Sequence, residues 1–150
     1  MTTDRAATPI EILLAEDNPG DVRLTREAFK RGRVATNINV ANNGEDVISY
    51  LRREGKYQLA VRPDLIVLDL NMPRKDGRAV LAEIKHDPDL DCIPVVVLTS
   101  SDADEDIVAC YKLHASCFIS KPFEVKEYNE VIRSIEEFWL TIAKLPKHCS

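Results

Sequence analysis

The sequence has little of several residue types that mark special classes of protein. Only five glycines and eight prolines occur among its 150 residues, while 45% of the residues are hydrophobic and 30% are charged. This balance excludes collagen-like and disordered chains. The length predicts one folded domain, because it leaves no room for a second domain of similar size.

The chain also lacks a long apolar run and an excess of positive charge. No segment approaches the roughly 18 consecutive apolar residues of a membrane span, and the start, MTTDRAATPIEI, has no basic stretch before an apolar one. We therefore expect a cytoplasmic protein without membrane contact. The net charge of −5 argues against sequence-independent nucleic-acid binding, although Lys30, Arg31 and Arg33 could form a local basic patch.

The cysteines show no spacing that is typical of a metal site or of a disulfide framework. Cys92, Cys110, Cys117 and Cys149 contain no Cys-x-x-Cys pair, and they form no metal-ligand pattern with the three histidines. We therefore expect reduced core or surface thiols and no zinc site.

Apolar runs alternate with amphipathic segments about five times along the chain. The apolar runs predict strands at residues 10–15, 36–42, 65–68, 93–100 and 116–120, each followed by a helix. Such continuously apolar strands are buried on both faces, and strands separated by single helices pair in parallel. The chain is therefore predicted to be a doubly wound α/β domain with a five-stranded parallel sheet and five helices. Residues 53–63 predict a loop with some order of its own.

Polar residues follow four of the predicted strands. In chain order they are Glu16, Asp17, Asn18, Asp69, Asn71, Thr99, Ser100, Ser101 and Lys121. The carboxyl ends of parallel strands share one edge of the sheet, where ligands of such folds bind. These residues therefore predict one site.

The charges at this edge limit what the site can hold. Two carboxylates about 4 Å apart repel by about 4 kcal/mol at an effective dielectric of about 20, so three of them need raised pKa values or a cation. Mg²⁺ suits carboxylates combined with a carbonyl and water. A metal beside a carboxylate suggests phosphate chemistry, with Asp69 as the nucleophile that forms an aspartyl phosphate.

At these residues the sequence resembles the receiver domains of two-component response regulators, from Ile10 to the last helix. The matching pieces are the acidic pair Glu16 and Asp17, the segment DLNMPRKDG from Asp69, a threonine after the fourth strand, and Lys-Pro after the fifth. The resemblance implies a flavodoxin-like fold with strand order 2-1-3-4-5. It also implies a receiver domain over residues 10–145, with tails at 1–9 and 146–150 and no output domain.

The resemblance implies roles for the residues that surround the acceptor. Asp69 would accept a phosphoryl group from a phosphohistidine on a sensor histidine kinase. Mg²⁺, or Mn²⁺ or Ca²⁺ in its place, would be held by Asp17, Asp69 and the carbonyl of Asn71. Glu16 would act through water, since its carboxylate reaches one methylene further than the aspartate of many receivers.

Further residues would bind the phosphoryl group or respond to it. Thr99 would bond a phosphate oxygen, and Lys121 would pair with the acceptor before transfer and with the phosphoryl group afterwards. Phe118 would be the switch aromatic, and Pro122 is a candidate for a cis peptide bond. Asn71 and Ser101 would tune the lifetime of the phosphorylated state.

Within this family the chain looks most like the single-domain regulators that accompany bacterial and cyanobacterial phytochrome kinases. The features that suggest this are the segment EDNPGDVRLTREAFK, the 53–63 loop and the segment LAEIKHDPDLDCIPVVVLTSSDADEDI. The likeness implies a light-signalling partner. A departure from the usual pattern is His114, which replaces a small residue at a turn before the fifth strand.

Other interpretations of the same residues stay open at this point. Asp17, Asn18, Thr99 and Ser100 could only cap helices, with Ser101 or Asp102 as further caps, and Lys121 could be a solvated surface residue. A phosphohydrolase or phosphotransferase acting on a small substrate could also use such a site. The asparagine at position 71 argues against it, because these enzymes use a second acid there as a proton donor. A pseudo-receiver that binds partners without phosphorylation is a third possibility.

The last predicted helix carries an apolar stripe that continues almost to Pro146. From 124 to 145 this helix would be about 33 Å long at about 1.5 Å per residue, so its end should extend beyond the sheet. An exposed stripe with aromatic residues predicts a homodimer, although the helix could instead pack only on its own domain. The stripe comprises Tyr128, Val131, Ile132, Ile135, Phe138, Trp139, Ile142 and Leu145.

Overall fold

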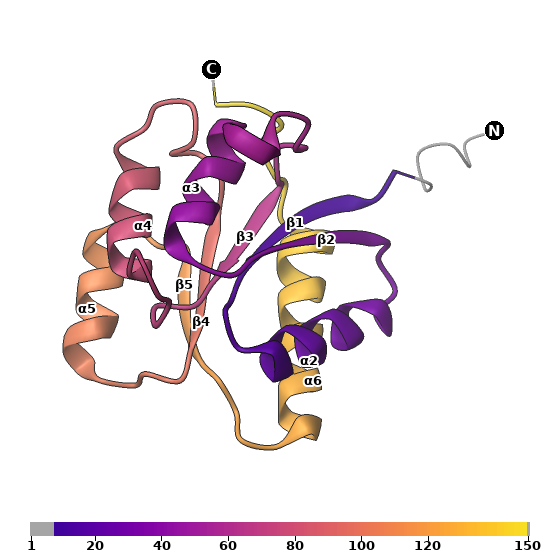
Figure 1. The fold of residues 1–150 in the computed structure, drawn as a ribbon. Coiled ribbons are helices and arrows are strands. Elements are labelled where there is room, and N and C mark those ends of the chain that lie inside the picture. Colours follow the sequence, from indigo (N-terminus) through magenta and orange to yellow (C-terminus); the bar gives the residue numbers. More distant parts are fainter. Residues whose placement is uncertain (1–7, 150) are drawn as a thin grey trace.

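The computed structural model describes residues 8–149 and contains a five-stranded parallel sheet between two layers of helices (Figure 1). The strand order β2-β1-β3-β4-β5 is the predicted one. The strands are β1 (Ile10–Ala15), β2 (Thr36–Ala41), β3 (Leu65–Leu68), β4 (Val95–Thr99) and β5 (Cys117–Ser120). The helices are α2 (Pro19–Lys30), α3 (Gly44–Arg52), α4 (Gly77–Lys85), α5 (Asp104–Lys112) and α6 (Val125–Glu137). Most of the predicted tail 1–9, and residue 150, lie outside the described residues.

The two faces of the sheet build two separate hydrophobic clusters. Helices α2 and α6 cover one face, and α3, α4 and α5 cover the other (Figure 1). Successive strand residues point to opposite faces, so Leu13 and Leu68 join the three-helix side while Leu14 and Val67 join the side of α2 and α6. Both faces of the central strands are therefore buried, which explains their unbroken apolar runs.

The register of the strands brings their carboxyl ends level with one another. Ala15 lies opposite Leu68 across β1 and β3, and Leu68 lies opposite Val97 across β3 and β4. Thr99 lies opposite Ser120 across β4 and β5. The residues that follow these ends are the predicted site residues, so the register alone gathers them at one edge.

The helix caps differ in part from the prediction. Asn18 caps α2 by accepting a hydrogen bond from the backbone N–H of Asp21 at 3.1 Å, which leaves Asp17 for another role. The expected caps of α5 at Ser100, Ser101 or Asp102 are wrong, because α5 begins later, at Asp104, after Ala103. The predicted turn before β5 is present, and His114 adopts a left-handed backbone conformation there, with φ of 65°.

The C-terminal helix is long, as predicted, but its last part is not α-helical. After α6 the chain continues as a π-helical turn over Phe138–Ile142, so the helical segment ends three residues before the predicted residue 145. The amide of Ala143 bonds the carbonyl of Phe138 at 2.7 Å, and the Thr141 hydroxyl donates to the carbonyl of Glu136. A stripe repeating at three and four residues does not distinguish this wider turn from an α-helix.

Two residues predicted for the dimer surface lie in the protein's own core. Tyr128 and Ile135 are each only 2% exposed, because they pack with α2 on the sheet. The Tyr128 hydroxyl also shares a buried hydrogen bond with the Thr25 hydroxyl at 2.9 Å. These two side chains are therefore unavailable to a partner, and their assignment to a dimer surface is wrong.

The expectation of four reduced thiols is also wrong. Cys92 and Cys149 form a disulfide, with Cα atoms 5.4 Å apart. The two cysteines are 57 residues apart in sequence, and only the return of the chain's end across the domain brings them together. Cys110 and Cys117 are reduced, as expected.

The peptide bond between Lys121 and Pro122 is trans, so the prediction of a cis bond at Pro122 is wrong. Trans is the ordinary state, since it is favoured by about 0.5–1 kcal/mol before proline. The backbone here is fixed by the amide of Lys121, which donates to the carbonyl of Thr99 at 2.7 Å.

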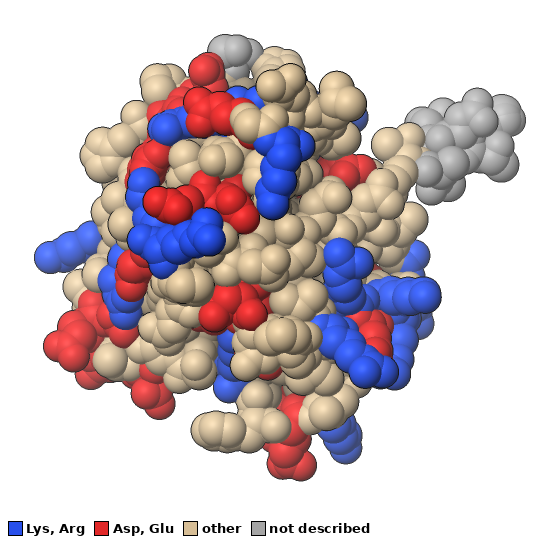
Figure 2. All heavy atoms as spheres, in the orientation of Figure 1, with Lys and Arg blue, Asp and Glu red and all other residues tan. Residues whose placement is uncertain are grey.

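The 53–63 loop has the order of its own that the sequence predicts. The loop contains a 3-10 turn at Gly55–Tyr57, and the Tyr50 hydroxyl donates to the carbonyl of Val61 at 3.1 Å. Figure 2 shows Lys and Arg gathered beside the end of α2 and the loop after it, and Lys30, Arg31 and Arg33 of this region are exposed. Within residues 8–149, the structure has no helix with both the length and the apolar character to cross a bilayer.

Candidate functional site

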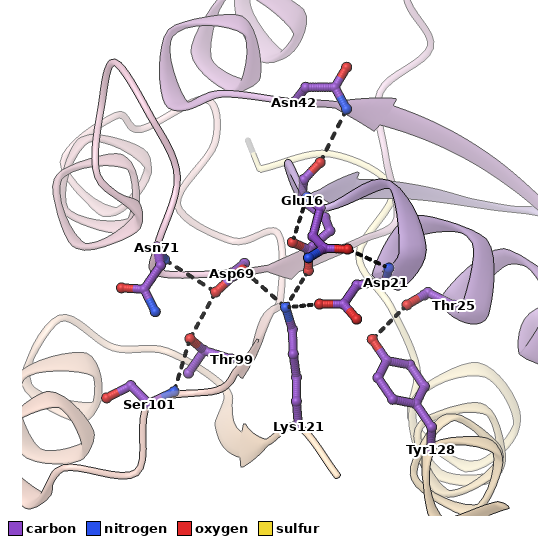
Figure 3. A network of polar contacts seen from close by, with 11 residues as sticks. Glu16, Asp21, Thr25, Asn42, Asp69, Asn71, Thr99, Ser101, Lys121 and Tyr128 are labelled. Carbon is purple, nitrogen blue, oxygen red and sulfur yellow. Dashed lines mark hydrogen bonds and ion pairs between the residues drawn. The ribbon is translucent and has the colours of Figure 1, made fainter. Parts of the chain in front are cut away.

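Asp69 follows β3 directly and is held by contacts to both carboxylate oxygens (Figure 3). Its Oδ1 accepts hydrogen bonds from the Thr99 hydroxyl at 2.8 Å and from the backbone N–H of Asn71 at 3.2 Å. Its Oδ2 lies 3.0 Å from Nζ of Lys121. The side chain is 5% exposed, so the apolar strand fixes the carboxylate from below and polar groups surround it above.

A glycine lets the next helix approach the backbone of Asp69. A Cβ atom at Gly77 would lie 2.4 Å from the Asp69 carbonyl oxygen and 2.5 Å from Cα of Leu70. The amide of Gly77 donates to the carbonyl of Leu70 at 2.8 Å. The Asp-Gly at the end of DLNMPRKDG is thus a packing requirement, and Asp76 caps α4 in the same turn.

Three carboxylates converge as predicted from the strand ends. One oxygen from each of Glu16, Asp17 and Asp69 lies within 4.8 Å of the other two. Glu16 and Asp69 are buried, whereas Asp17 is exposed at the rim. Three hard oxygen donors with solvent on one side fit Mg²⁺ or Mn²⁺, which keep several waters. The donor set is therefore suited to a divalent cation.

Lys121 binds three acids and is not a solvated surface residue. Its Nζ lies 2.6 Å from Glu16 Oε1, 2.8 Å from Asp21 Oδ2 and 3.0 Å from Asp69 Oδ2. The side chain is only 8% exposed. Asp21 is a site residue that the sequence analysis missed, and its one signal was an acid in the first turn of the helix after the acidic pair.

The surroundings shift the pKa values of the two buried acids, Glu16 and Asp69, in opposite directions. Burial and the charge of Asp69 raise the pKa of Glu16 to about 7, although Lys121 opposes this shift. Burial alone would also raise the pKa of Asp69, but the charge of Lys121 and the hydrogen bonds from Thr99 and Asn71 lower it overall. Asp69 is therefore ionised at neutral pH, as a nucleophilic carboxylate must be.

The pKa of Lys121 is raised. Burial lowers it, but the hydrogen bonds to Asp21 and Glu16 and the charges of Glu16 and Asp69 outweigh that effect. The ammonium therefore stays charged at the centre of the acid cluster.

Thr99 and its neighbours connect the site to the three-helix side. Thr99 is fully buried and caps no helix. The amide of Ser101 approaches the Thr99 hydroxyl at 3.5 Å, and the Ser101 hydroxyl bonds Asp106, which pairs with an arginine of α4. Phe118 is half-buried and packs on the cluster beneath α3, α4 and α5. Its amide donates to the Tyr111 hydroxyl at 3.2 Å.

Comparison with known proteins gives one consistent family. The family model described as response regulator receiver domain matches residues 12–133. The chain is 42% identical over 144 residues to the response regulator Rcp1 of Synechocystis sp., which covers 96% of this chain and 98% of that protein.

Two solved structures are similar along nearly their whole length. The Mn²⁺-bound form of Rcp1 has a TM-score of 0.88 at 43% identity and covers 92% of this chain and 99% of that one. The phosphorylated cyanobacterial phytochrome response regulator RcpA has a TM-score of 0.90 at 47% identity and covers 93% of this chain and 99% of that one.

Proposed function

The chain belongs to the response regulator receiver family, and from this membership we propose that Asp69 accepts a phosphoryl group from the phosphohistidine of a sensor histidine kinase. The observation that carries the proposal is the setting of Asp69, an ionised and buried carboxylate between an ammonium, a threonine hydroxyl and two further acids. The phosphorylated state of RcpA supports the same chemistry for a close relative.

The chain's own residues account for each part of the proposed transfer. An oxygen of Asp69 attacks phosphorus, an acyl phosphate bond forms, and the bond from phosphorus to the histidine nitrogen breaks, with its electron pair leaving on the imidazole. Lys121 neutralises charge on the phosphoryl oxygens, and the Thr99 hydroxyl can turn from Asp69 to one of them. A divalent cation, held by Asp17 and Asp69 and by Glu16 through water, would supply further charge neutralisation when bound.

Several finer roles belong to the same proposal. Mg²⁺ is the proposed ion, with the carbonyl of Asn71 as an additional ligand, and the Mn²⁺-bound form of Rcp1 supports Mn²⁺ as a substitute. Thr99 and Phe118 form the proposed switch pair. Asn71 and Ser101 are proposed to tune the lifetime of the acyl phosphate, because they flank the approach of water to Asp69 and Thr99.

Incubation with acetyl phosphate and Mg²⁺, followed by intact mass measurement, tests the assignment. We expect one added phosphoryl group on the wild-type protein, none on Asp69→Asn, and none when EDTA removes the cation. Asp89→Asn is the matched control, because Asp89 is an exposed aspartate outside the site, and it should take up phosphoryl like the wild type. Equal uptake by Asp69→Asn, or no uptake by the wild type, contradicts the proposal.

The two alternative functions are less well supported. A small-molecule phosphohydrolase would need a proton donor two residues after the nucleophile, and Asn71 stands there. A binding module that is never phosphorylated would not need Asp69, Lys121 and Thr99 in mutual contact. The receiver family is a signalling family, and we propose that this chain catalyses only its own phosphorylation and dephosphorylation.

We propose a phytochrome-type histidine kinase as the phosphoryl donor, on the basis of the similarity to a cyanobacterial phytochrome response regulator. A cytoplasmic location follows from that partner, since the kinase is charged from ATP. Incubating the protein with an autophosphorylated cyanobacterial phytochrome, and in parallel with an unrelated histidine kinase, tests the pairing. Faster transfer from the phytochrome is the expected result, and equal rates contradict it. Nucleic-acid binding remains unexpected.

We also propose a homodimer through the end of the C-terminal helix. Phe138 and Ile142 are 51% and 70% exposed, and the rings of Phe138 and Trp139 contact edge to face at 5.1 Å. Val131, in the preceding helix α6, is half-buried. A changed protein contact is a natural output of phosphorylation, because added charge can bias one packing over another.

Sedimentation velocity tests the dimer. Ile142→Glu should shift the protein towards monomer, because it places a charge in the proposed apolar contact. Leu59→Glu is the control, since Leu59 is an exposed apolar residue of the 53–63 loop, away from this helix. An unchanged dimer in Ile142→Glu removes the helix end from the interface.

A further inference from the structure

The end of the chain is fastened to the edge of the sheet that lies opposite the acid cluster. After the π-helical turn, residues 143–149, here called the C-terminal segment, run back to the amino-terminal edge of the sheet, where the chain's end lies in Figure 1. Cys92 stands shortly before β4 and bonds Cys149 of this segment. Arg62 stands shortly before β3, and its guanidinium donates to the carbonyl of Pro146 at 3.4 Å.

We propose that Cys92 and Cys149 form a redox site, a thiol–disulfide pair that exchanges with dithiols and controls the attachment of the C-terminal segment. This site is separate from the proposed phosphoryl acceptor, so neither proposal depends on the other.

The geometry allows the bond to form and to be reached. The Cα atoms are 5.4 Å apart, inside the range of about 4.4–6.8 Å that disulfides span. Cys92 and Cys149 are both half-buried, so neither residue is enclosed in the core. The backbone amide of Cys92 also donates to Sγ of Cys149 at 3.3 Å, which fixes the two cysteines relative to one another.

Arg62 gives the pair the charge that thiol exchange requires. One guanidinium nitrogen lies 3.4 Å from Sγ of Cys92 and 3.3 Å from Sγ of Cys149. Exchange proceeds by attack of a thiolate on one sulfur, and the other sulfur leaves as a thiolate. A neighbouring arginine stabilises that leaving thiolate whichever sulfur is attacked.

The other two cysteines lack these features and serve as internal controls. Cys110 lies on the buried face of α5, and burial raises the pKa of its thiol. Burial also raises the pKa of the Cys117 thiol. A thiol that stays protonated is a poor nucleophile, so these two residues should not take part in exchange.

The proposed reaction is balanced by one equivalent of a dithiol. A thiolate of the dithiol attacks one sulfur, the bond between Cys92 and Cys149 breaks, and a mixed disulfide forms. The second thiol of the reductant displaces the protein sulfur, so the dithiol is oxidised to a disulfide while the protein gains two electrons and two protons. A low-molecular-weight disulfide reverses the reaction.

Opening the bond between Cys92 and Cys149 would also affect a cavity beside the C-terminal segment. The C-terminal segment forms part of the wall of a cavity of about 270 Å³ that is also lined by Ile10 and Trp139. Reduction leaves the segment attached through the bond from Arg62 to Pro146 and through its apolar contacts. Because these contacts are weaker than a covalent bond, the segment should detach more often, and the wall that it forms beside Trp139 should then open to solvent or to a partner.

Counting thiols tests the bond itself. Air-oxidised protein, denatured in iodoacetamide without reductant, should carry two carbamidomethyl groups, at Cys110 and Cys117, and protein reduced first should carry four. A reduced sample dialysed into oxidised dithiothreitol should return to two. Four groups on the oxidised protein would overturn the proposal.

Trypsin cleavage after Lys144 and Lys147 tests the release of the segment. We expect cleavage at least about tenfold faster in the reduced protein and in Cys149→Ser, because cleavage follows the population of the open segment. Cys117→Ser should cleave at the wild-type rate in both states. Equal cleavage of oxidised and reduced wild type would overturn the switch, even where thiol counting finds the bond.

Arg62→Gln separates an exchange site from a purely structural disulfide. If the arginine stabilises the leaving thiolate, reduction by dithiothreitol at pH 7 should slow several-fold in this variant. An unchanged rate would overturn the assignment of Arg62 to the site. Phosphoryl uptake from acetyl phosphate, measured on the same oxidised and reduced samples, reports separately on Asp69.

Discussion

Replacing Lys121 with methionine removes the ammonium from the acid cluster and keeps a side chain of similar length. The ammonium lies 2.6, 2.8 and 3.0 Å from oxygens of Glu16, Asp21 and Asp69. Removing one partner of a buried ion pair costs about 3–5 kcal/mol, because it leaves charge uncompensated. We expect the free energy of unfolding to fall by about 3 kcal/mol at pH 8 in EDTA, at the lower end of this range. Glu16 can take up a proton and Asp21 is partly exposed, which softens the loss.

The loss should depend on pH with a defined sign. The pKa of Glu16 is already raised to about 7 in the wild type, and loss of the ammonium raises it further. Between the ordinary pKa of 4.5 and the raised value, Glu16 holds a proton in the folded variant but not in the unfolded chain. The stability of the variant therefore falls as the pH rises through this range. The difference between Lys121→Met and wild type should therefore be smaller at pH 5 than at pH 8.

Mg²⁺ should compensate for the missing ammonium. Two unit positive charges about 4 Å apart, such as the ammonium and one charge of a bound cation, repel by about 1 kcal/mol in water and by about 4 kcal/mol at an effective dielectric of about 20. Removing this repulsion should tighten Mg²⁺ binding to Lys121→Met by at least about tenfold, which corresponds to about 1.4 kcal/mol. Phosphoryl uptake should nevertheless slow, because Lys121 is lost as a partner of the phosphoryl oxygens.

Urea unfolding followed by the fluorescence of Trp139, the only tryptophan, measures these changes. The titrations are run in EDTA at pH 5 and pH 8, and then with increasing Mg²⁺. Lys112→Met is the control, because Lys112 is an exposed lysine of α5, and it should stay within about 0.5 kcal/mol of wild type. A Lys121→Met protein as stable as wild type at pH 8 in EDTA, or with weaker Mg²⁺ binding, refutes the reasoning.

Three further substitutions test other parts of the structure. Gly77→Ala places a Cβ 2.4 Å from the carbonyl oxygen of Asp69 and should cost about 1–3 kcal/mol in urea unfolding while slowing phosphoryl uptake; unchanged values contradict this. Tyr128→Phe leaves the buried Thr25 hydroxyl without its partner and should lower the unfolding free energy by about 1–3 kcal/mol, whereas no change would show that the hydrogen bond is dispensable. Glu83→Gln removes a carboxylate whose pKa is lowered by a hydrogen bond from Lys75. The ionised Glu83 stabilises the fold above pH 4.5, the ordinary pKa of glutamate, and this stabilisation is lost as the pH falls below that value. This substitution should therefore cost up to about 1 kcal/mol at pH 7 and nothing measurable near pH 3, and an equal cost at both pH values argues against the ion pair.

The sequence predicts the sheet and the acceptor well because both depend on local patterns. The run Leu65–Leu68 is a strand in the structure with the predicted bounds, because its four apolar residues are all buried and an aspartate stands at each end. The strand predicted at 93–100 shortens to Val95–Thr99, because Pro94 cannot donate a ladder hydrogen bond. Asp69 follows from its place at the end of such a strand.

Two features were missed because they join distant parts of the chain. Asp21 contacts Lys121 across 100 residues, and its local sequence reads only as an acid at a helix start. The pairing of Cys92 with Cys149 depends on the return of the chain after α6, which no cysteine spacing encodes. Patterns of three and four residues likewise could not distinguish the buried Tyr128 from the exposed end of the same stripe.

Lys121 links the proposed acceptor to helix α2, since its three partners are Glu16 after β1, Asp21 in α2 and Asp69 after β3. A phosphoryl group carries about −1.5 to −2 charges at pH 7, more than the single charge of the Asp69 carboxylate that it modifies. The ammonium would then have a stronger partner on β3 and would bind Asp21 of α2 less tightly. Helix α2 is joined to α6 through the buried contact between Thr25 and Tyr128 at 2.9 Å. A change of charge at Asp69 therefore acts through Lys121 on Asp21 of α2, and α2 itself packs on the C-terminal helix.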